Sequence, residues 1–379
     1  MVKVKSWLFT EVRGKVKKAE FRRRKNKVTE LSQKRIPFNP RTPAQREVRR
    51  TYGKCVEEWN KLSEAEKREW RIIGTLQGIS GYNAFMRDCI TKKLGAVWYE
   101  LLIDNTGNPN ALSDFQVLLE VTNDEAFFKD ADFKQEALEF YDADKATLLN
   151  HYTELWDTLH YNAKIWIKVP YIPANECRFI YLKMNTKRTT DLSNPENVFD
   201  FYDNFEGDLS KWIVINGTNY SIEGGTLKAT GTFPGGPADV IRTKKLIGKE
   251  AIVEYDVKPA SDVEIACVIW AKGAADEPLW MVIHRGKNIY YWTGSSWESK
   301  ASGTNYRNVG EWNKEKIIFT EAGEIKAYTN DNLVVSYTDA TPIEGYVGFR
   351  KESDSIEYVD NFRVRKYTKP EPTVSYSKI

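Results

Sequence analysis

Two carboxylates separated by one residue are the first candidates for chemistry in this chain. Glu254 and Asp256 lie in a run typical of a β-strand, so both side chains face the same way, as the carboxylate pair of a glycosidase must. The competing interpretation is an acidic strand face exposed to water, which is common on sandwich surfaces. We favour the exposed face, and no catalytic residue is predicted.

An aromatic set between residues 270 and 297 is the second candidate. Sugars bind by stacking their C–H faces on aromatic rings, with a few polar groups fixing their orientation. Because side chains alternate along a strand, core packing accounts for part of the set, and the rest would form a contact patch for a glycan or a protein. The predicted patch comprises Trp270, Trp280, His284, Arg285, Tyr290, Tyr291, Trp292 and Trp297.

Asp203 and Asp360 form a third candidate, as oxygen ligands for Ca²⁺. They fall in the expected first and last strands of a C-terminal sandwich, which would lie side by side. The alternative is that both carboxylates accept hydrogen bonds at strand ends. No other cofactor is predicted. The three histidines, His151, His160 and His284, stand at no defensible triad or metal spacing.

Charge is distributed unevenly along the 379 residues. The formal net charge is only +3, yet residues 1–50 hold 17 Lys/Arg and 4 Asp/Glu, a net of +13. Residues 96–379 hold 31 and 43, a net of −12. This pattern is typical of a basic arm joined to an acidic body.

The basic cluster of the arm is a candidate contact for an anion or for assembly. Its members are Arg22, Arg23, Arg24, Lys25 and Lys27. Non-specific binding of nucleic acid through phosphates is one interpretation, and contact with an acidic protein surface, including another copy of this chain, is the other. We favour protein contact.

Composition and cysteine spacing exclude several classes. Aromatic residues make up 13% and hydrophobic residues 41%, which supplies more than one core. No apolar run reaches the length of a membrane span, and the first residues lack the apolar region of a signal peptide. Cys55, Cys89, Cys177 and Cys267 are far apart and form no C-x-x-C pair, so neither a metal cage nor a disulfide is predicted. Synthesis in a cytoplasm is therefore expected.

The elements that would position these residues divide the chain into six segments. The expected segments are a basic arm (1–41), a three-helix domain (42–95), a β-sandwich (96–187), a linker (188–198), a second sandwich (199–367) and a tail (368–379) that is either loose or used in contacts. Capping boxes at Thr42–Gln45 and Ser63–Glu66 open two of the helices. Ten short strands between Gly/Asn/Asp turns in the second sandwich indicate two antiparallel sheets. The predicted fold is thus mainly β, with a small helical part.

Three segments carry a resemblance to known families. The Asn39–Gln45 motif, followed by Trp59–Ser63 and Ser80–Phe85, resembles small virion-associated proteins of tailed bacterial and archaeal viruses. In residues 97–187, Ile103–Gly107 and Ala163–Pro170 resemble a domain of unassigned function found in surface proteins.

The C-terminal segment resembles the concanavalin-A-like, laminin-G type of jelly roll. The resemblance lies in Asp203–Gly207, the Glu223–Leu227 turn, Gly345–Phe349 and Val359–Val364. It implies a jelly-roll fold, which hosts lectins, glycosidases and scaffolds alike. Some jelly-roll glycanases carry Glu-x-Asp-x-x-Glu on a strand, and the third carboxylate is missing here.

The favoured hypothesis is a non-enzymatic structural protein of a virus particle, made in the host cytoplasm. The arm and helices would anchor it to other virion proteins and to copies of itself in the capsid or tail, and the sandwiches would serve decoration or attachment to host-surface glycans. The alternative is a cell-surface protein that binds or modifies carbohydrate. A nucleic-acid-associated protein acting through the arm is a third interpretation.

Overall fold

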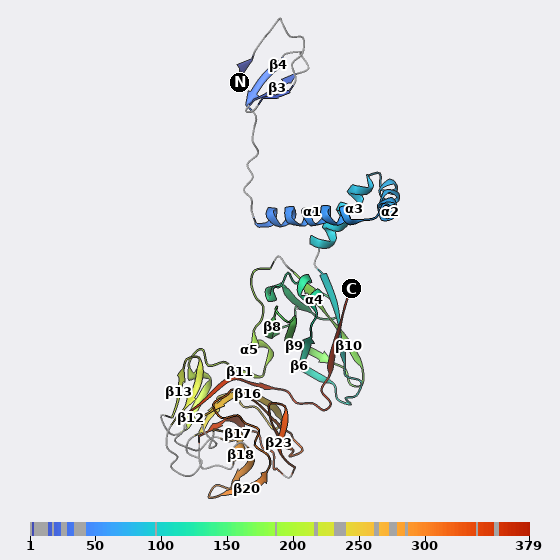
Figure 1. Ribbon diagram of the computed structural model, residues 1–379. Coiled ribbons are helices and arrows are strands. Elements are labelled where there is room, and N and C mark those ends of the chain that lie inside the picture. The colour runs from blue at the N-terminus through green and yellow to red at the C-terminus, as the bar shows by residue number, and fades with distance from the viewer. Residues whose placement is uncertain are drawn as a thin grey trace. The chain divides into compact units, whose positions relative to one another are not determined.

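The computed structural model of the chain contains two compact units, Met1–Gly95 and Ala96–Ile379. Figure 1 shows the order of their elements along the chain. None of the helices described combines the length and apolar character needed to cross a bilayer. The structure describes residues 2–3, 14–16, 19–23, 29–33, 43–94, 97–185, 188–215, 219–230, 240–260, 265–272, 279–284, 287–338, 340–351 and 356–379.

The arm carries four short antiparallel strands in the order β1-β4-β3-β2. Arg22 and Arg23 lie on β3, opposite Glu30 and Thr29 of β4. The other members of the basic cluster, Arg24, Lys25 and Lys27, lie outside the described residues. The strands are β1 (Val2–Lys3), β2 (Gly14–Val16), β3 (Ala19–Arg23) and β4 (Thr29–Gln33).

Three helices follow, as the apolar periodicity predicts, and Thr42 of the first predicted capping box lies outside the described residues. They are α1 (Pro43–Lys61), α2 (Glu64–Leu76) and α3 (Gly81–Leu94). The Ser63 capping box is confirmed: the Glu66 backbone N–H donates to Ser63 Oγ (3.3 Å), and the Ser63 N–H donates to Glu66 Oε2 (2.8 Å). Trp59 and Trp70 pack on Phe85 of α3, with ring centroids 5.3 Å apart in both pairs. They therefore belong to the small core, as expected.

A disulfide joins Cys55 of α1 to Cys89 of α3, so the prediction of no disulfide is wrong. The two residues are 34 positions apart, and no local spacing marks them as a pair. The antiparallel packing of α1 against α3 brings their apolar stripes together, and each cysteine lies on its stripe. Among the described residues, Cys177 and Cys267 are free thiols.

The first sandwich of the second unit is built from two antiparallel sheets. One has the order β26-β5-β10-β7 and the other β6-β9-β8. A buried apolar core that includes Phe115, Phe127 and Ile165 fills the space between them. Its elements are β5 (Val97–Asp104), β6 (Leu112–Val121), α4 (Glu125–Asp130), η1 (Gln135–Ala137), β7 (Leu138–Tyr141), β8 (His151–Asp157), β9 (Asn162–Ile172) and β10 (Cys177–Met184).

The tail expected from residue 368 returns to this first sandwich. Its strand β26 (Thr373–Lys378) pairs antiparallel with β5 over its whole length. Tyr376 packs on Phe127 with centroids 5.4 Å apart and donates a hydrogen bond to Asp124 (2.9 Å). The first sandwich is therefore completed by the last residues of the chain, and the second sandwich is inserted between its strands.

The second sandwich has the two antiparallel sheets that the strand spacing predicts. An eight-stranded sheet runs β13-β14-β25-β16-β21-β22-β23, with β11 also paired to β25, and a seven-stranded sheet runs β12-β15-β24-β17-β18-β19-β20. All ten predicted strands are present, and the concanavalin-A-like jelly roll is confirmed.

The eight strands are β11 (Phe201–Asp203), β13 (Tyr220–Glu223), β14 (Thr226–Ala229), β16 (Ala251–Pro259), β21 (Asn313–Phe319), β22 (Ile325–Thr329), β23 (Asn332–Tyr337) and β25 (Glu357–Arg365). The seven are β12 (Trp212–Ile215), β15 (Val240–Thr243), β17 (Ala266–Ala271), β18 (Leu279–His284), β19 (Asn288–Trp292), β20 (Trp297–Ser302) and β24 (Tyr346–Arg350).

The segment expected as a linker, 188–198, packs between the two sandwiches. Its end forms the short helix α5 (Pro195–Val198), capped by the Asn194 side chain. Val198 and Phe199 are buried against Trp166 of the first sandwich. The Gln116 side chain also donates to the Val198 carbonyl (3.0 Å). These contacts join the sandwiches through a packed surface.

Candidate functional site

The predicted aromatic patch is divided by strand alternation into two layers. Trp270, Trp280 and Tyr291 turn inward and pack with the core between the two sheets. Trp270 contacts Phe319 with centroids 5.4 Å apart, and its indole N–H donates to the Lys249 carbonyl (3.0 Å). These three rings are structural, because the sandwich core needs their volume.

Tyr290, Trp292 and Trp297 belong to a second apolar layer on the outer face of the seven-stranded sheet. Trp292 and Trp297 are direct cross-strand partners, and their ring centroids are 5.1 Å apart. Both indole Nε1 atoms are buried, and neither has a hydrogen-bond partner among the described residues. Buried tryptophan N–H groups normally find an acceptor, so these two stand out.

Two arginines share this outer face, and the sequence reasoning missed both. The Arg350 guanidinium lies 4.8 Å from the centroid of the Trp297 ring, and that of Arg242 lies 3.8 Å from the centroid of Tyr346. The alternation of Tyr346, Gly348 and Arg350 with the core residues of β24 is the signal that could have found them. We call this set, Arg242, Tyr290, Trp292, Trp297, Tyr346 and Arg350, the aromatic–arginine face.

The two remaining members of the predicted patch add little here. His284 ends β18 opposite Asn288 of β19, so it lies at one end of the same sheet. Arg285 lies outside the described residues.

The predicted carboxylate Glu254 lies at the joint between the two sandwiches. Its Oε2 accepts from Arg363 Nε (2.6 Å), and its Oε1 accepts from Arg365 Nη2 (3.2 Å). The side chain is only 14% exposed, so the expectation of a solvent-exposed acidic face is wrong at this residue. The first sandwich covers the strand face that the sequence alone leaves open.

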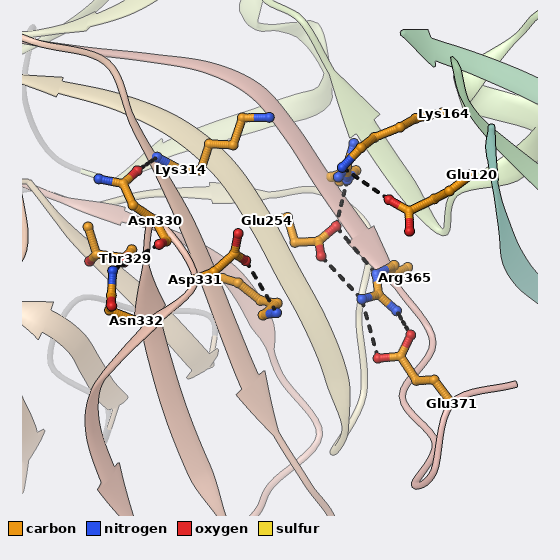
Figure 2. Close-up of polar contacts among 12 residues, drawn as sticks. Glu120, Lys164, Glu254, Lys314, Thr329, Asn330, Asp331, Asn332, Arg365 and Glu371 are labelled. Carbon is orange, nitrogen blue, oxygen red and sulfur yellow. Dashed lines mark hydrogen bonds and ion pairs between the residues drawn. The ribbon is translucent and has the colours of Figure 1, made fainter. Parts of the chain in front are cut away.

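A chain of alternating charges extends from Glu254 in both directions. Arg363 also pairs with Glu154 of the first sandwich (3.0 Å), and Arg365 pairs with Glu371 (2.8 Å). Figure 2 shows Arg365 between the carboxylates of Glu254 and Glu371. Burial by itself raises the pKa of Glu254, but the two guanidinium groups override this and hold the pKa well below its usual range. Glu254 is therefore a fixed carboxylate and is unsuited to act as a general acid.

Asp256 has a different hydrogen-bond partner from Glu254. The ladder between β16 and β25 shifts register between the two residues, and Asp256 accepts a hydrogen bond from Asn361 Nδ2 (2.9 Å). Both residues line a cleft of about 580 Å³ between the sandwiches. The cleft walls carry mixed charge that includes Lys164, Lys314 and Asp331. The pair thus serves the joint and does not form a glycosidase arrangement.

The strands of the calcium candidates are adjacent, as expected, since β11 pairs with β25. Asp203 is buried, and its two oxygens accept from Trp212 Nε1 (2.7 Å) and from the Phe205 backbone N–H (2.9 Å). Among the residues that the structure describes, no three carboxylate, histidine or cysteine side chains are arranged to hold a metal ion. The contacts of Asp203 fit the hydrogen-bonding alternative, and a calcium site at Asp203 and Asp360 stays a prediction.

Asp360 is predicted to weaken the fold at neutral pH. Partial burial raises its pKa to about 6, the carboxylates of Asp256, Glu206 and Asp203 add to the rise, and the Asn361 N–H opposes it. The protonated form is favoured in the fold, so its stabilising contribution is complete below about pH 4 and is lost as the pH rises through about 6. Asp360→Asn should raise the free energy of unfolding by about 1 kcal/mol at pH 7.5, after allowance for solvent screening, and by almost nothing at pH 4.

Urea titrations at the two pH values measure this difference. Asp331→Asn is the matched control, because the Asp331 side chain is 97% exposed and its replacement should be neutral at both pH values. A pH-independent effect of Asp360→Asn would contradict the assignment.

Comparisons with known proteins bear on parts of the chain. Residues 134–215 match a domain of unknown function (DUF2341), and residues 195–365 match the 3-keto-alpha-glucoside-1,2-lyase-like domain. Each match covers less than half of the chain. The predicted resemblance of the middle segment to a domain of unassigned function is thereby confirmed in part. No curated protein matches the chain as a relative.

Solved structures that resemble the chain share part of it at low sequence identity. The carbohydrate-binding module CBM66 from Bacillus subtilis is 16% identical over 41% of this chain and 96% of its own, with a TM-score of 0.35. A galectin-like protein of unknown function from Bacillus subtilis is 12% identical over 44% and 96%, with a TM-score of 0.36. The Bacillus licheniformis beta-glucanase is 14% identical over 47% and 96%, with a TM-score of 0.30. The fold described above rests on its own sheets and register.

Proposed function

We propose that this protein binds carbohydrate through the aromatic–arginine face of its second sandwich and does not cleave it. The observation that carries the proposal is the Trp292–Trp297 pair, whose two indole N–H groups have no acceptor in the part of the chain that the structure describes. Aromatic faces stack on sugar rings, and unsatisfied donors are available to sugar oxygens. The match of residues 195–365 to a lyase-like domain named for a glucoside supports a saccharide ligand.

Binding without cleavage is favoured by the state of the predicted acid pair. Glu254 is neutralised by Arg363 and Arg365 and packs beneath the first sandwich, so it cannot donate a proton to a glycosidic oxygen. The aromatic–arginine face lies on the other sheet of the sandwich. The carboxylates and the aromatic face are thus separate features of the domain.

Trp292→Ala is expected to weaken binding to a polysaccharide panel by tenfold or more, because loss of a stacked ring costs about 1–3 kcal/mol. Affinity electrophoresis or a glycan array measures the change. Trp312→Ala is the matched control, since Trp312 is an exposed tryptophan that precedes β21 of the other sheet. If the wild type and a correctly folded Trp292→Ala variant bound polysaccharide equally well, the aromatic–arginine face would not be the binding site.

We further propose that residues 1–95 anchor the protein in a larger assembly, which the resemblance to virion-associated proteins specifies as a virus particle. Support comes from the division of the chain into two compact units, the first carrying the basic arm. In this proposal the arm contacts virion proteins or other copies of the chain. Mass spectrometry of purified particles tests the idea, and absence of the chain from them would overturn it.

A further inference from the structure

Arg242 is an unusual buried cation. The residue is 7% exposed, and within the described ranges its Nε atom has no hydrogen-bond partner. The guanidinium stacks on Tyr346, and its Nη1 donates to the Thr243 carbonyl (3.0 Å). A buried charge without a counter-charge costs several kcal/mol unless something compensates it. The ring and the carbonyl compensate the charge in part, and neither is a counter-charge.

Three other buried cations of the same sandwich pair with carboxylates. Arg307 donates to Glu315 (2.7 Å), and Lys351 pairs with Glu357 (3.1 Å). Arg365 pairs with both Glu254 and Glu371. Within the part of the chain that the structure describes, Arg242 has no carboxylate partner. Arg242 differs in this respect from Arg307, Lys351 and Arg365.

The surroundings of Arg242 offer hydrogen-bond donors in excess. On the sheet it stands opposite Gly348, where the two strands approach so closely that an added Cβ would lie 1.9 Å from the Ile241 carbonyl oxygen. Arg350, the next outward residue of β24, places a second guanidinium against Trp297. The orphaned atoms of this face, Nε of Arg242 and Nε1 of Trp292 and Trp297, are all donors. A neutral sugar offers hydroxyl groups that both donate and accept, whereas a carboxylate or sulfate only accepts.

We infer that the aromatic–arginine face takes an anionic saccharide, in which a carboxylate or sulfate group meets Arg242 while a sugar ring stacks on the Trp292–Trp297 pair. This inference rests on the proposed carbohydrate binding and specifies its substrate class. The charge complements the buried guanidinium, the anionic oxygens complement the unpartnered donors, and the rings supply apolar contact. Neutral saccharides with the same backbone bind more weakly.

Matched polysaccharides test the charge preference with the full chain. Polygalacturonate is compared with its methyl ester, and dextran sulfate with dextran, so that the two pairs separate a carboxylate from a sulfate. We expect the charged member of one pair to bind at least tenfold more tightly than its neutral partner. We also expect Arg242→Gln to remove this preference, because a charge-assisted hydrogen bond to a buried group is lost.

The controls separate this face from the basic arm, which attracts any polyanion. Lys314→Gln removes one positive charge from the other sheet, so it should bind like the wild type, and the contribution of the arm is common to all variants. Arg242→Lys keeps the positive charge and should retain part of the preference for charged polymers. A loss seen in Arg242→Gln but not in Arg242→Lys is then due to the missing charge and not to a folding defect. Thermal melting of each variant checks the fold.

Each outcome decides the inference. Equal effects of Arg242→Gln and Lys314→Gln on the charged polymers would overturn it, since the preference would then come from general charge. Tight binding of neutral polymers that needs Trp292 but not Arg242 would overturn it while leaving the proposed carbohydrate binding intact. Binding to none of the four polymers, nor to a neutral glycan panel, would overturn both.

Discussion

Replacing Glu254 with alanine is expected to destabilise the second unit, Ala96–Ile379, by about 3–5 kcal/mol. The change leaves Arg363 and Arg365 with one carboxylate each, Glu154 and Glu371, in place of two. Breaking a buried ion pair from one side is costly because the remaining charge stays desolvated. Urea unfolding followed by tryptophan fluorescence measures the loss from the midpoint and slope.

Two companion variants show whether charge or packing is responsible. Glu120→Ala breaks the exposed pair with Lys164 (3.2 Å), which Figure 2 also shows, and it should cost no more than about 0.5 kcal/mol. Glu254→Gln keeps the shape and loses the charge. The pKa of Glu254 is lowered in the fold, so the stability that its charge contributes is present above about pH 4.5 and declines as the pH falls further.

The advantage of the wild type over Glu254→Gln should therefore shrink in acid. If Glu254→Ala were no less stable than Glu120→Ala, the ion pairs of Glu254 with Arg363 and Arg365 would contribute nothing to the stability of the unit.

Loss of the Cys55–Cys89 disulfide is expected to destabilise the helical part of the first unit by about 3–4 kcal/mol, because the bond closes a loop of about 34 residues in the unfolded chain. The helices have a small core, so few fully buried side chains contribute to their stability. A helical domain of this size has little stability to spare. The double variant Cys55→Ala, Cys89→Ala should lower the thermal transition of the helices and speed their proteolysis.

Reducing agent supplies an independent measurement on the wild type. Dithiothreitol should reproduce the effect of the double variant, while leaving the transition of the two sandwiches in place. Cys177→Ser serves as the control, because Cys177 is an exposed free thiol of the second unit. Identical melting of the helices with and without reductant would contradict a stabilising disulfide.

The effect of Glu254 illustrates why residue spacing alone misleads at this site. The i, i+2 spacing of Glu254 and Asp256 correctly predicts that both lie on one strand, β16. Whether that face meets water depends on the first sandwich, whose Trp166 and Glu154 come from strands far away in the sequence. Arg363 and Arg365 lie more than 100 residues downstream, and only the pairing of β16 with β25 brings them within reach.

The aromatic set shows the same limit in a different way. Alternation predicts that some of its rings lie in the core, but it cannot choose the inward set without knowing which face of the seven-stranded sheet packs on the other sheet. The structure makes Trp280 and Tyr291 core residues and leaves Trp292 and Trp297 outside. The arginines of this face were missed because Arg242 and Arg350 are more than 100 residues apart and become neighbours only through the pairing of β15 with β24.

Local features of this protein follow from the sequence by itself. The Ser63 capping box, the three helices, ten of the fifteen strands of the jelly roll and the basic arm are all set by propensity, spacing and charge, which act between residues close together in the chain. The tertiary structure decided the disulfide, the burial of Glu254, the return of β26 to the first sandwich and the make-up of the aromatic–arginine face. Each of these depends on segments that meet only after the chain has folded, so no local pattern records them.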